Sequence, residues 1–125
     1  MVDEIRYIFK LRIGCDGSRE TLLIRKLILP TELNCHRCGI PETRQHIIQE
    51  CGIYNQHRTK LVRELNRTEE FRKTIEELEL WQVCLYSTEF QRRISKLDKD
   101  KQVKIDGVIK SYIVKIRKIR NCMFQ

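Results

Sequence analysis

The sequence predicts a mainly α-helical protein, because of how its apolar residues are spaced and where its glycines and prolines stand. Apolar side chains recur every three or four residues along most of the chain, which places them on one face of a helix. Glycine or proline interrupts this spacing at several points, where helices are expected to end. With 125 residues, 41% of them apolar, the chain has enough material for one domain with a modest core.

Two helices are expected in the first 30 residues. Ile5, Ile8 and Phe9 fall on one helical face, and this helix is expected to stop at the glycines of residues 14–17. A second helix should follow and end before Pro30, since proline disfavours the helical conformation in the residue before it.

Three further helices are expected in the middle of the chain. A short one should begin at Pro41, whose missing amide proton costs nothing in a first turn, and Gly52 is placed to end it. The next presents Tyr54, His57, Leu61 and Leu65 on one face. Thr68 begins another, which we expect to run through residues 71–81 and to place Trp81 near its end.

Residues 103–120 carry a long amphipathic pattern. Its apolar stripe consists of Ile105, Val108, Ile109, Tyr112, Ile113 and Ile116. The many β-branched residues also fit a strand, but the three-and-four spacing favours a helix. Such a stripe should be buried against residues 71–81 or against another molecule. The basic residues of the other face should meet solvent or an acidic partner: Lys104, Lys110, Lys115, Arg117 and Lys118.

Charge and composition indicate a soluble intracellular protein. Lys and Arg outnumber Asp and Glu by 25 to 17, which gives a net charge of +8 and permits attraction to a polyanion such as nucleic acid. No apolar stretch approaches the roughly 20 residues of a membrane-spanning helix, so no membrane association is expected. The first residues do not resemble a secretory signal. The nucleus or cytoplasm is therefore expected, where thiols stay reduced.

Three cysteines and one histidine follow the spacing C-x2-C-x7-H-x4-C: Cys35, Cys38, His46 and Cys51. They supply four soft or borderline donors, as a tetrahedral Zn2+ ion requires. A two-residue gap lets the sulfurs of Cys35 and Cys38 turn toward one point, and Gly39 permits the tight backbone this needs. Because four protein ligands leave no position for water, the site is expected to be structural. The sequence therefore predicts a small helical domain built around one CCHC structural zinc site.

The remaining cysteines and histidines have simpler interpretations. The quartet itself could be ordinary cysteines near a histidine, since compatible spacings also arise by chance. His36 lies inside the two-residue gap, where its ring should point outward, and His57 lies on an apolar helix face. Cys15, Cys84 and Cys122 are isolated from one another and are expected to be small buried hydrophobes.

The quartet and its surroundings resemble the zinc-binding segment at the C-terminal end of reverse transcriptases of non-LTR retrotransposons. That segment has the form C-x2-C-G-x2-E-T-x2-H-x4-C-x2-Y-x3-R. The matching residues are Cys35, Cys38, Gly39, Glu42, Thr43, His46, Cys51, Tyr54 and Arg58. The similarity covers about residues 5–65, and the rest of the chain matches only as a helical tail.

The resemblance implies a retroelement-derived, zinc-knuckle-like accessory segment that binds RNA or single-stranded DNA. The polymerase's aspartate-rich site and the carboxylates of a ribonuclease H have no counterpart in this chain, so no catalysis is carried over and the chain is not expected to be an enzyme. Four basic residues surround the predicted zinc site and could contact phosphates: Arg37, Arg44, Arg58 and Lys60.

A protein-interaction module is the alternative. In that hypothesis zinc only stabilises a helical scaffold, and the C-terminal helix binds a protein partner. The sequence divides into a helical lead-in with the CCHC zinc-binding module over residues 1–66 and a helical C-terminal region over residues 67–125.

Overall fold

The computed structural model describes residues 2–13, 19, 26 and 29–123, without the side chains of 2–5, 9, 13, 31 and 121–123. The predicted turn at residues 14–17, most of the helix expected before Pro30, and Cys15 lie outside the described residues. The side chains of Ile5, Phe9 and Cys122 are likewise not described.

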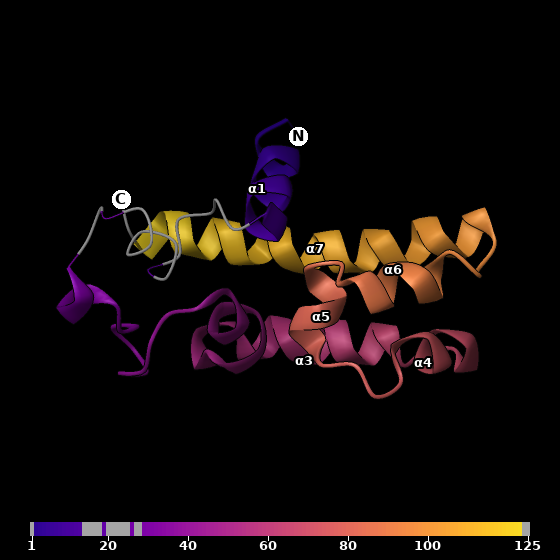
Figure 1. Cartoon of the computed structure of the whole chain (residues 1–125), viewed down its shortest axis with the longest axis horizontal. Helices are drawn as coiled ribbons and strands as arrows, with labels where there is room; N and C mark the ends of the chain where they lie inside the picture. Colours follow the sequence, from indigo (N-terminus) through magenta and orange to yellow (C-terminus); the bar gives the residue numbers. More distant parts are fainter. Residues whose placement is uncertain (1, 14–18, 20–25, 27–28, 124–125) are drawn as a thin grey trace.

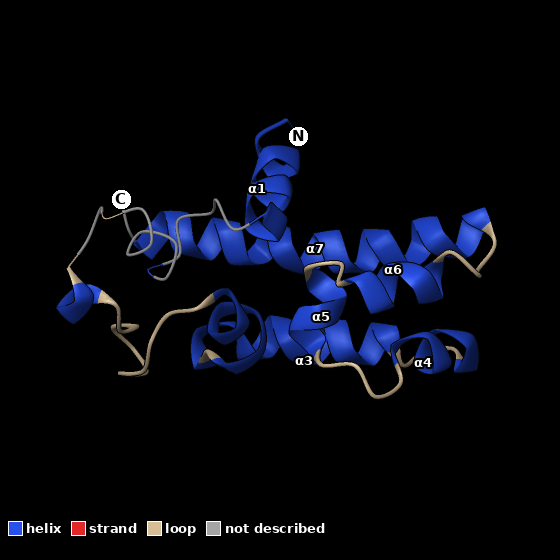
Figure 2. Ribbon diagram, viewed as in Figure 1, coloured by secondary structure: helices blue, strands red, loops and turns tan. Residues whose placement is uncertain are grey.

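The mainly α-helical fold predicted from the sequence is confirmed (Figure 2). The α-helices are α1 (Val2–Ile13), α3 (Asn55–Leu65), α4 (Glu69–Ile75), α5 (Leu80–Cys84), α6 (Thr88–Ile94) and α7 (Lys99–Met123). Over residues 29–54, which the structure describes without a gap, three short turns of helix precede α3: η1 (Pro30–Glu32), the π-helical η2 (His46–Glu50) and η3 (Gly52–Tyr54). Within the described ranges there is no strand, only a single antiparallel bridge between Asn34 and Pro41. None of the helices described is both long and apolar enough to cross a membrane.

The long helix α7 runs along most of the length of the molecule (Figure 1). It lies antiparallel to α3, and α1 crosses it steeply near its middle. α6 leads into α7 and contacts α4, while α5 contacts both η2 and α7. The metal-ligand segment around η2 therefore lies at one end of α3, beneath the second half of α7.

One hydrophobic core joins both regions of the chain. Its buried members include Ile8, Leu11, Ile47, Ile48, Tyr54, Leu61, Leu65, Phe71, Val83, Phe90, Ile105, Ile109, Tyr112, Ile113 and Ile116. The stripe predicted on residues 103–120 is thus helical and buried, except that Val108 is only half-buried. Lys104, Lys110, Lys115 and Lys118 are exposed as predicted, and Arg117 is half-buried.

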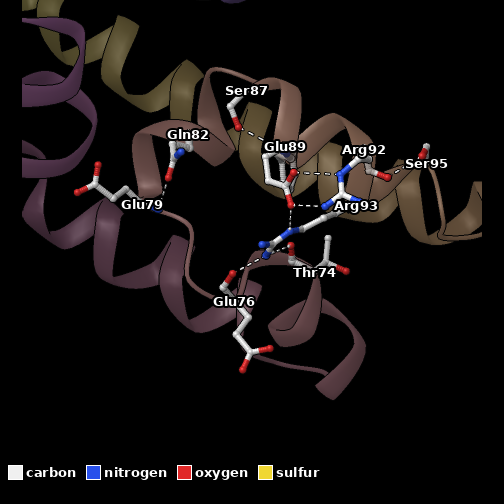
Figure 3. Close-up of polar contacts among 10 residues, drawn as sticks. Thr74, Glu76, Glu79, Gln82, Ser87, Glu89, Arg92, Arg93 and Ser95 are labelled. Carbon is white, nitrogen blue, oxygen red and sulfur yellow. Dashed lines mark hydrogen bonds and ion pairs between the residues drawn. The ribbon is translucent and has the colours of Figure 1, made fainter.

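The single helix expected over residues 71–81 is wrong, because the chain turns after Ile75. Glu77 has a φ of 65°, in the left-handed region that helices do not use. α5 then begins after Glu79, whose backbone N–H donates to Oε1 of Gln82 at 2.8 Å (Figure 3). As a consequence α7 packs chiefly on α3 and α1, with a smaller contact to α5.

Two short helices begin at hydroxyl caps. The side chain of Thr68 accepts from the backbone N–H of Phe71 at 3.1 Å, which starts α4 where the sequence predicted. Ser87 does the same for Phe90 at 3.2 Å and starts α6. Phe71 and Phe90 are both buried, so each cap also fixes where an aromatic ring enters the core.

The side chain of Arg93 ties α6 to α4 (Figure 3). Its Nη1 donates to the carbonyls of Thr74, at 3.4 Å, and of Glu76, both at the C-terminal end of α4. Cations favour this end of a helix, where the last carbonyls lack partners. Glu89 holds Arg93 from the other side, with 3.0 Å between its Oε1 and Nε of the arginine, and also binds Arg92.

A second polar cluster holds α1 against α5 and α7. The guanidinium of Arg12 stacks 3.7 Å from the ring centre of Tyr86, in cation–π geometry. Its Nε donates to the carbonyl of Cys84 at 3.4 Å, and its Nη2 lies 3.8 Å from Asp106 on α7. One side chain of the first helix therefore meets both later helices.

Replacing Ile113 with Ala should lower the free energy of unfolding by about 2–5 kcal/mol, the usual cost of truncating a fully buried aliphatic side chain. Ile113 is 0% exposed, whereas Val103 of the same helix is 70% exposed. Val103→Ala is therefore the matched control and should change stability by no more than about 0.5 kcal/mol. Urea unfolding measures both variants, and equal losses would show that α7 is not packed as described.

The Glu89 ion pairs should give a defined dependence of stability on pH. Hydrogen bonds from Arg92, then from Arg93, lower the pKa of Glu89 to about 2. Because the folded pKa is depressed, this stabilisation is present above the ordinary value of 4.5 and is lost as pH falls toward about 2. Glu89→Gln should therefore destabilise by a constant amount between about pH 8 and 5, and by less at lower pH. A difference that grows on acidification would contradict the pairing.

Candidate metal centre

The four predicted ligand side chains lie together. The ligand atoms of Cys35, Cys38, His46 and Cys51 are all within 4.8 Å of one another. Cys35 and Cys38 come from the turn after η1, His46 opens η2, and Cys51 follows the last residue of η2. This group of side chains, called the Cys/His cluster below, could hold one metal ion.

The turn that carries Cys35 and Cys38 is closed by its own backbone. The N–H of Gly39 donates to the carbonyl of Cys35 at 2.9 Å, and the N–H of Cys35 donates to Ile40 at 2.7 Å. Gly39 has a φ of 72°, which a residue with a side chain adopts only with strain. The tight turn predicted at Gly39 is therefore confirmed.

The helical segment that presents His46 starts later than the sequence predicted. Pro41 belongs to the bridge with Asn34, and the first helical residue is Arg44. Thr43 caps this turn, since its Oγ1 accepts from the backbone N–H of His46 at 2.9 Å. Proline tolerates the first turn of a helix, but Pro41 instead pairs with Asn34 across the turn that carries Cys35 and Cys38.

η2 is a π-helical turn that ends at Glu50, and Cys51 is its C-cap. The backbone of Cys51 is extended, with φ −65° and ψ 125°, while its N–H donates to the carbonyl of His46 at 2.7 Å. This hydrogen bond spans five residues, as in a π-helix, and draws the two ligands together. Gly52 does not end this helix as predicted: Cys51 is its C-cap, and Gly52 opens η3 with no positive φ.

His46 is buried in a way that calls for a metal or another strong partner. Its side chain is 1% exposed, and neither ring nitrogen has a hydrogen-bond partner among the described residues. Nδ1 lies 3.5 Å from Oε2 of Glu50, which is too long for a good hydrogen bond. A buried polar group without a partner is costly, and a metal bond to the imidazole would remove that cost.

The sulfur positions fit a tetrahedral ion. The Sγ atom of Cys51 lies 4.0 Å from that of Cys35 and 3.9 Å from that of Cys38. Metal–sulfur bonds of about 2.3 Å, the length found for zinc, give sulfur–sulfur edges of about 3.8 Å in a tetrahedron. All three thiols are free.

Protonation of the thiols opposes metal binding at Cys51 more than at Cys38. Burial raises the pKa of Cys51 to about 12, whereas a backbone hydrogen bond from Gly52 lowers the pKa of Cys38 below its ordinary value. Because a thiolate is the ligand, a metal must displace the proton of Cys51 when it binds. Metal affinity should therefore rise with pH.

Side chains from two helices satisfy the carbonyls around η2. Arg58 of α3 donates through Nε to Ile48 at 2.9 Å and through Nη2 to Cys51 at 2.8 Å. The hydroxyl of Tyr112 on α7 also donates to Ile48, at 2.6 Å. Gln49 accepts from the backbone N–H of Trp81 at 3.1 Å, so α5 is held to the same turn.

A buried ion pair joins the end of α7 to the segment between the ligands. Nη2 of Arg120 lies 3.1 Å from Oε1 of Glu42, and the two side chains are only 11% and 4% exposed. Burial works to lower the pKa of Arg120, but the hydrogen bond to Glu42 and the nearby groups of Glu42, Tyr54 and Tyr7 together outweigh it and hold the pKa above its ordinary value. Glu42 also accepts from the backbone N–H of Arg19 at 3.0 Å.

The four predicted phosphate contacts have different surroundings. Arg37 and Lys60 are exposed, whereas Arg44 and Arg58 are half-buried. Nη1 of Arg44 donates to the carbonyl of Leu11 at 3.2 Å, and Nε of Arg58 donates to the carbonyl of Ile48 in η2. Arg37 and Lys60 are therefore the members of this set whose charge is open to a ligand.

The other predicted positions agree with their simpler interpretations where the structure describes them. His36 is exposed, and its Nε2 lies 2.9 Å from Nη2 of Arg19. His57 is half-buried on α3 and belongs to no metal-ligand group among the described residues. Cys84 is fully buried, and burial raises its pKa to about 12, as expected of an inert core thiol.

Sequence reasoning missed Arg120 as a residue of this site. The motif identified Glu42, but no local pattern connects it with a residue 78 positions away. Comparisons of the chain with protein-family models, with curated proteins and with solved structures gave no match. The resemblance to retrotransposon reverse transcriptases therefore rests on the motif residues alone.

The protein should bind one metal ion per chain and lose it when His46 is replaced by Ala. The loss should also unfold the segment from Cys35 to Tyr54, because metal binding contributes on the order of 10 kcal/mol to small sites of this kind. His36→Ala removes an exposed imidazole from the same turn and is the matched control, with full metal content expected. Elemental analysis and proteolysis test both variants, and stability unchanged after complete chelation would exclude a structural metal.

Proposed function

We propose that the chain is a zinc-stabilised helical module that binds nucleic acid as a non-catalytic accessory segment. The observation that carries this proposal is the Cys/His cluster, whose three sulfurs and one imidazole form a donor set suited to Zn2+. Zinc prefers this soft, four-coordinate environment, whereas hard cations such as Mg2+ prefer oxygen ligands.

A structural role for the zinc follows from the donor count. Cys35, Cys38, His46 and Cys51 would fill all four tetrahedral positions, so no position remains for water or substrate. When bound, the ion would hold the turn at Gly39 against η2 and neutralise thiolates. In this proposal the chain therefore acts by binding, without a chemical step of its own.

Nucleic acid is the proposed ligand because the chain is strongly basic and because its zinc-binding segment resembles one from nucleic-acid-binding proteins. The chain carries a net charge of +8, and Arg37 beside the cluster and Lys60 on α3 are both exposed. The resemblance of residues 35–58 to the zinc-binding segment of retrotransposon reverse transcriptases supports RNA or single-stranded DNA as the partner. A retroelement origin of the chain is part of the same proposal.

Affinity for a single-stranded oligonucleotide should fall steeply with salt, and replacing Arg37 and Lys60 together by Gln should flatten that dependence. Each phosphate contact contributes about 0.7 to the slope of log affinity against log salt, so the double variant should lose roughly 1.4. Lys96→Gln with Lys99→Gln removes the same charge from two exposed positions, one after α6 and one at the start of α7, and is the matched control.

Fluorescence anisotropy at several salt concentrations measures these slopes. No binding at low salt, or equal slopes in the two double variants, would reject nucleic-acid binding through this surface. Elemental analysis of the same preparation tests zinc separately. A protein that contains zinc but does not bind oligonucleotides would support the zinc-stabilised module and reject nucleic-acid binding.

A further inference from the structure

A groove runs along the seam between α3 and α7, and none of the four residues of the Cys/His cluster lines it. It has a volume of about 360 Å³, and its α3 wall presents His57, Lys60, Leu61 and Glu64 at helical spacing. A second hollow of about 450 Å³ continues it past the start of α4, and the two share Glu64, Lys104 and Val108. The seam is therefore an extended channel along two antiparallel helices.

Gly107 lines the groove on the α7 side and contributes no side chain to it. It lies inside a 25-residue helix, where glycine costs about 0.5–1 kcal/mol relative to alanine. A Cβ added at Gly107 would meet nothing within 4 Å, so no described neighbour requires the glycine. Val103, one turn earlier on the same line of the helix, is 70% exposed.

Lysines surround this apolar line. Lys60 of α3 and Lys104 and Lys115 of α7 line the groove and are exposed. No ion pair forms at any of the three within the described part of the chain. Glu64, the acidic residue of the lining, already has a partner, with 3.4 Å between its Oε2 and Nη1 of Arg67. The rim is thus positive, and its floor is apolar.

We propose that this groove is a docking site for an acidic amphipathic helix of a partner protein. Two helices side by side accept the apolar ridge of a third, and Gly107 would let that ridge approach closely. Glutamates on the edges of the docked helix would meet the three lysines. α3 has 11 residues and is about 16 Å long, enough for about three turns of a partner helix.

Charge and surface chemistry decide between this occupant and two others. A second copy of the chain would bring the same lysines to the groove, and like charges would oppose its docking. A groove that holds a single strand adds stacking of bases on exposed aromatic rings to its phosphate contacts, but Tyr112, the tyrosine of the groove lining, is 3% exposed and donates its hydroxyl to Ile48. Docking in this groove depends neither on the metal nor on the proposed nucleic-acid function.

A synthetic peptide of about 15 residues, helical, with leucines on one face and glutamates elsewhere, is the probe. The parent protein should bind it saturably and with one peptide per chain. Gly107→Leu should weaken binding at least about tenfold by filling the groove, whereas Gly107→Ala should change it no more than about twofold. Both should fold at least as stably as the parent, which thermal unfolding checks.

Reversing the charge of a groove lysine tests the proposal independently of Gly107. Lys104→Glu should weaken peptide binding about tenfold, while Lys118→Glu, an exposed position of α7 outside the groove, should have little effect at the same net charge. A peptide with lysines in place of the glutamates should not bind. The proposal is overturned if the acidic peptide shows no saturable binding up to about 1 mM, or binds Gly107→Leu as well as the parent.

A single-stranded oligonucleotide is the competing ligand. If Gly107→Leu abolishes oligonucleotide binding and the peptide does not compete, nucleic acid occupies the groove and the protein-docking proposal fails. If oligonucleotide binding instead responds to Arg37 but not to Gly107 or Lys104, nucleic acid binds outside the groove, and only Lys60 of the groove lining is shared with that surface.

Discussion

The fold depends on holding a buried imidazole and two buried thiols together. His46, Cys35 and Cys51 are each no more than 5% exposed, yet they come from a glycine turn and the two ends of a single π-helical turn. Segments this short do not stay ordered by their own hydrogen bonds. A metal bond to each ligand would satisfy the imidazole nitrogen and fix the three pieces of backbone relative to one another.

The surrounding helices are arranged around this constraint. Arg58 from α3 and Tyr112 from α7 both donate to the carbonyl of Ile48, so the π-helical turn is bonded to both long walls of the core. The Glu42–Arg120 pair then joins the far end of α7 to the same segment. Removing either member of such a buried pair leaves a charge without compensation, which is strongly destabilising. Ligand geometry and the packing of α7 are therefore coupled.

The sequence by itself determined the helical class, the helix start at Thr68, the buried stripe of α7 and the composition of the Cys/His cluster. Each follows from spacing within a few residues: a three-and-four period places side chains on one helix face, and a two-residue gap with Gly39 turns two sulfurs to one point. The sequence predicts the helix start at Thr68 but not the one at Ser87, because the apolar pattern weakens after Ser87.

Only the tertiary structure decided the break after Ile75, the start of the ligand helix at Arg44, the pairing of Glu42 with Arg120 and the use of Arg58 inside the fold. These features depend on which elements meet. The carbonyls at the end of α4 have Arg93 as a partner only because α6 packs beside them, and Arg58 serves η2 only because α3 folds back on it. Local spacing fixes which face a residue occupies, but its partner is set by packing between segments far apart in the chain.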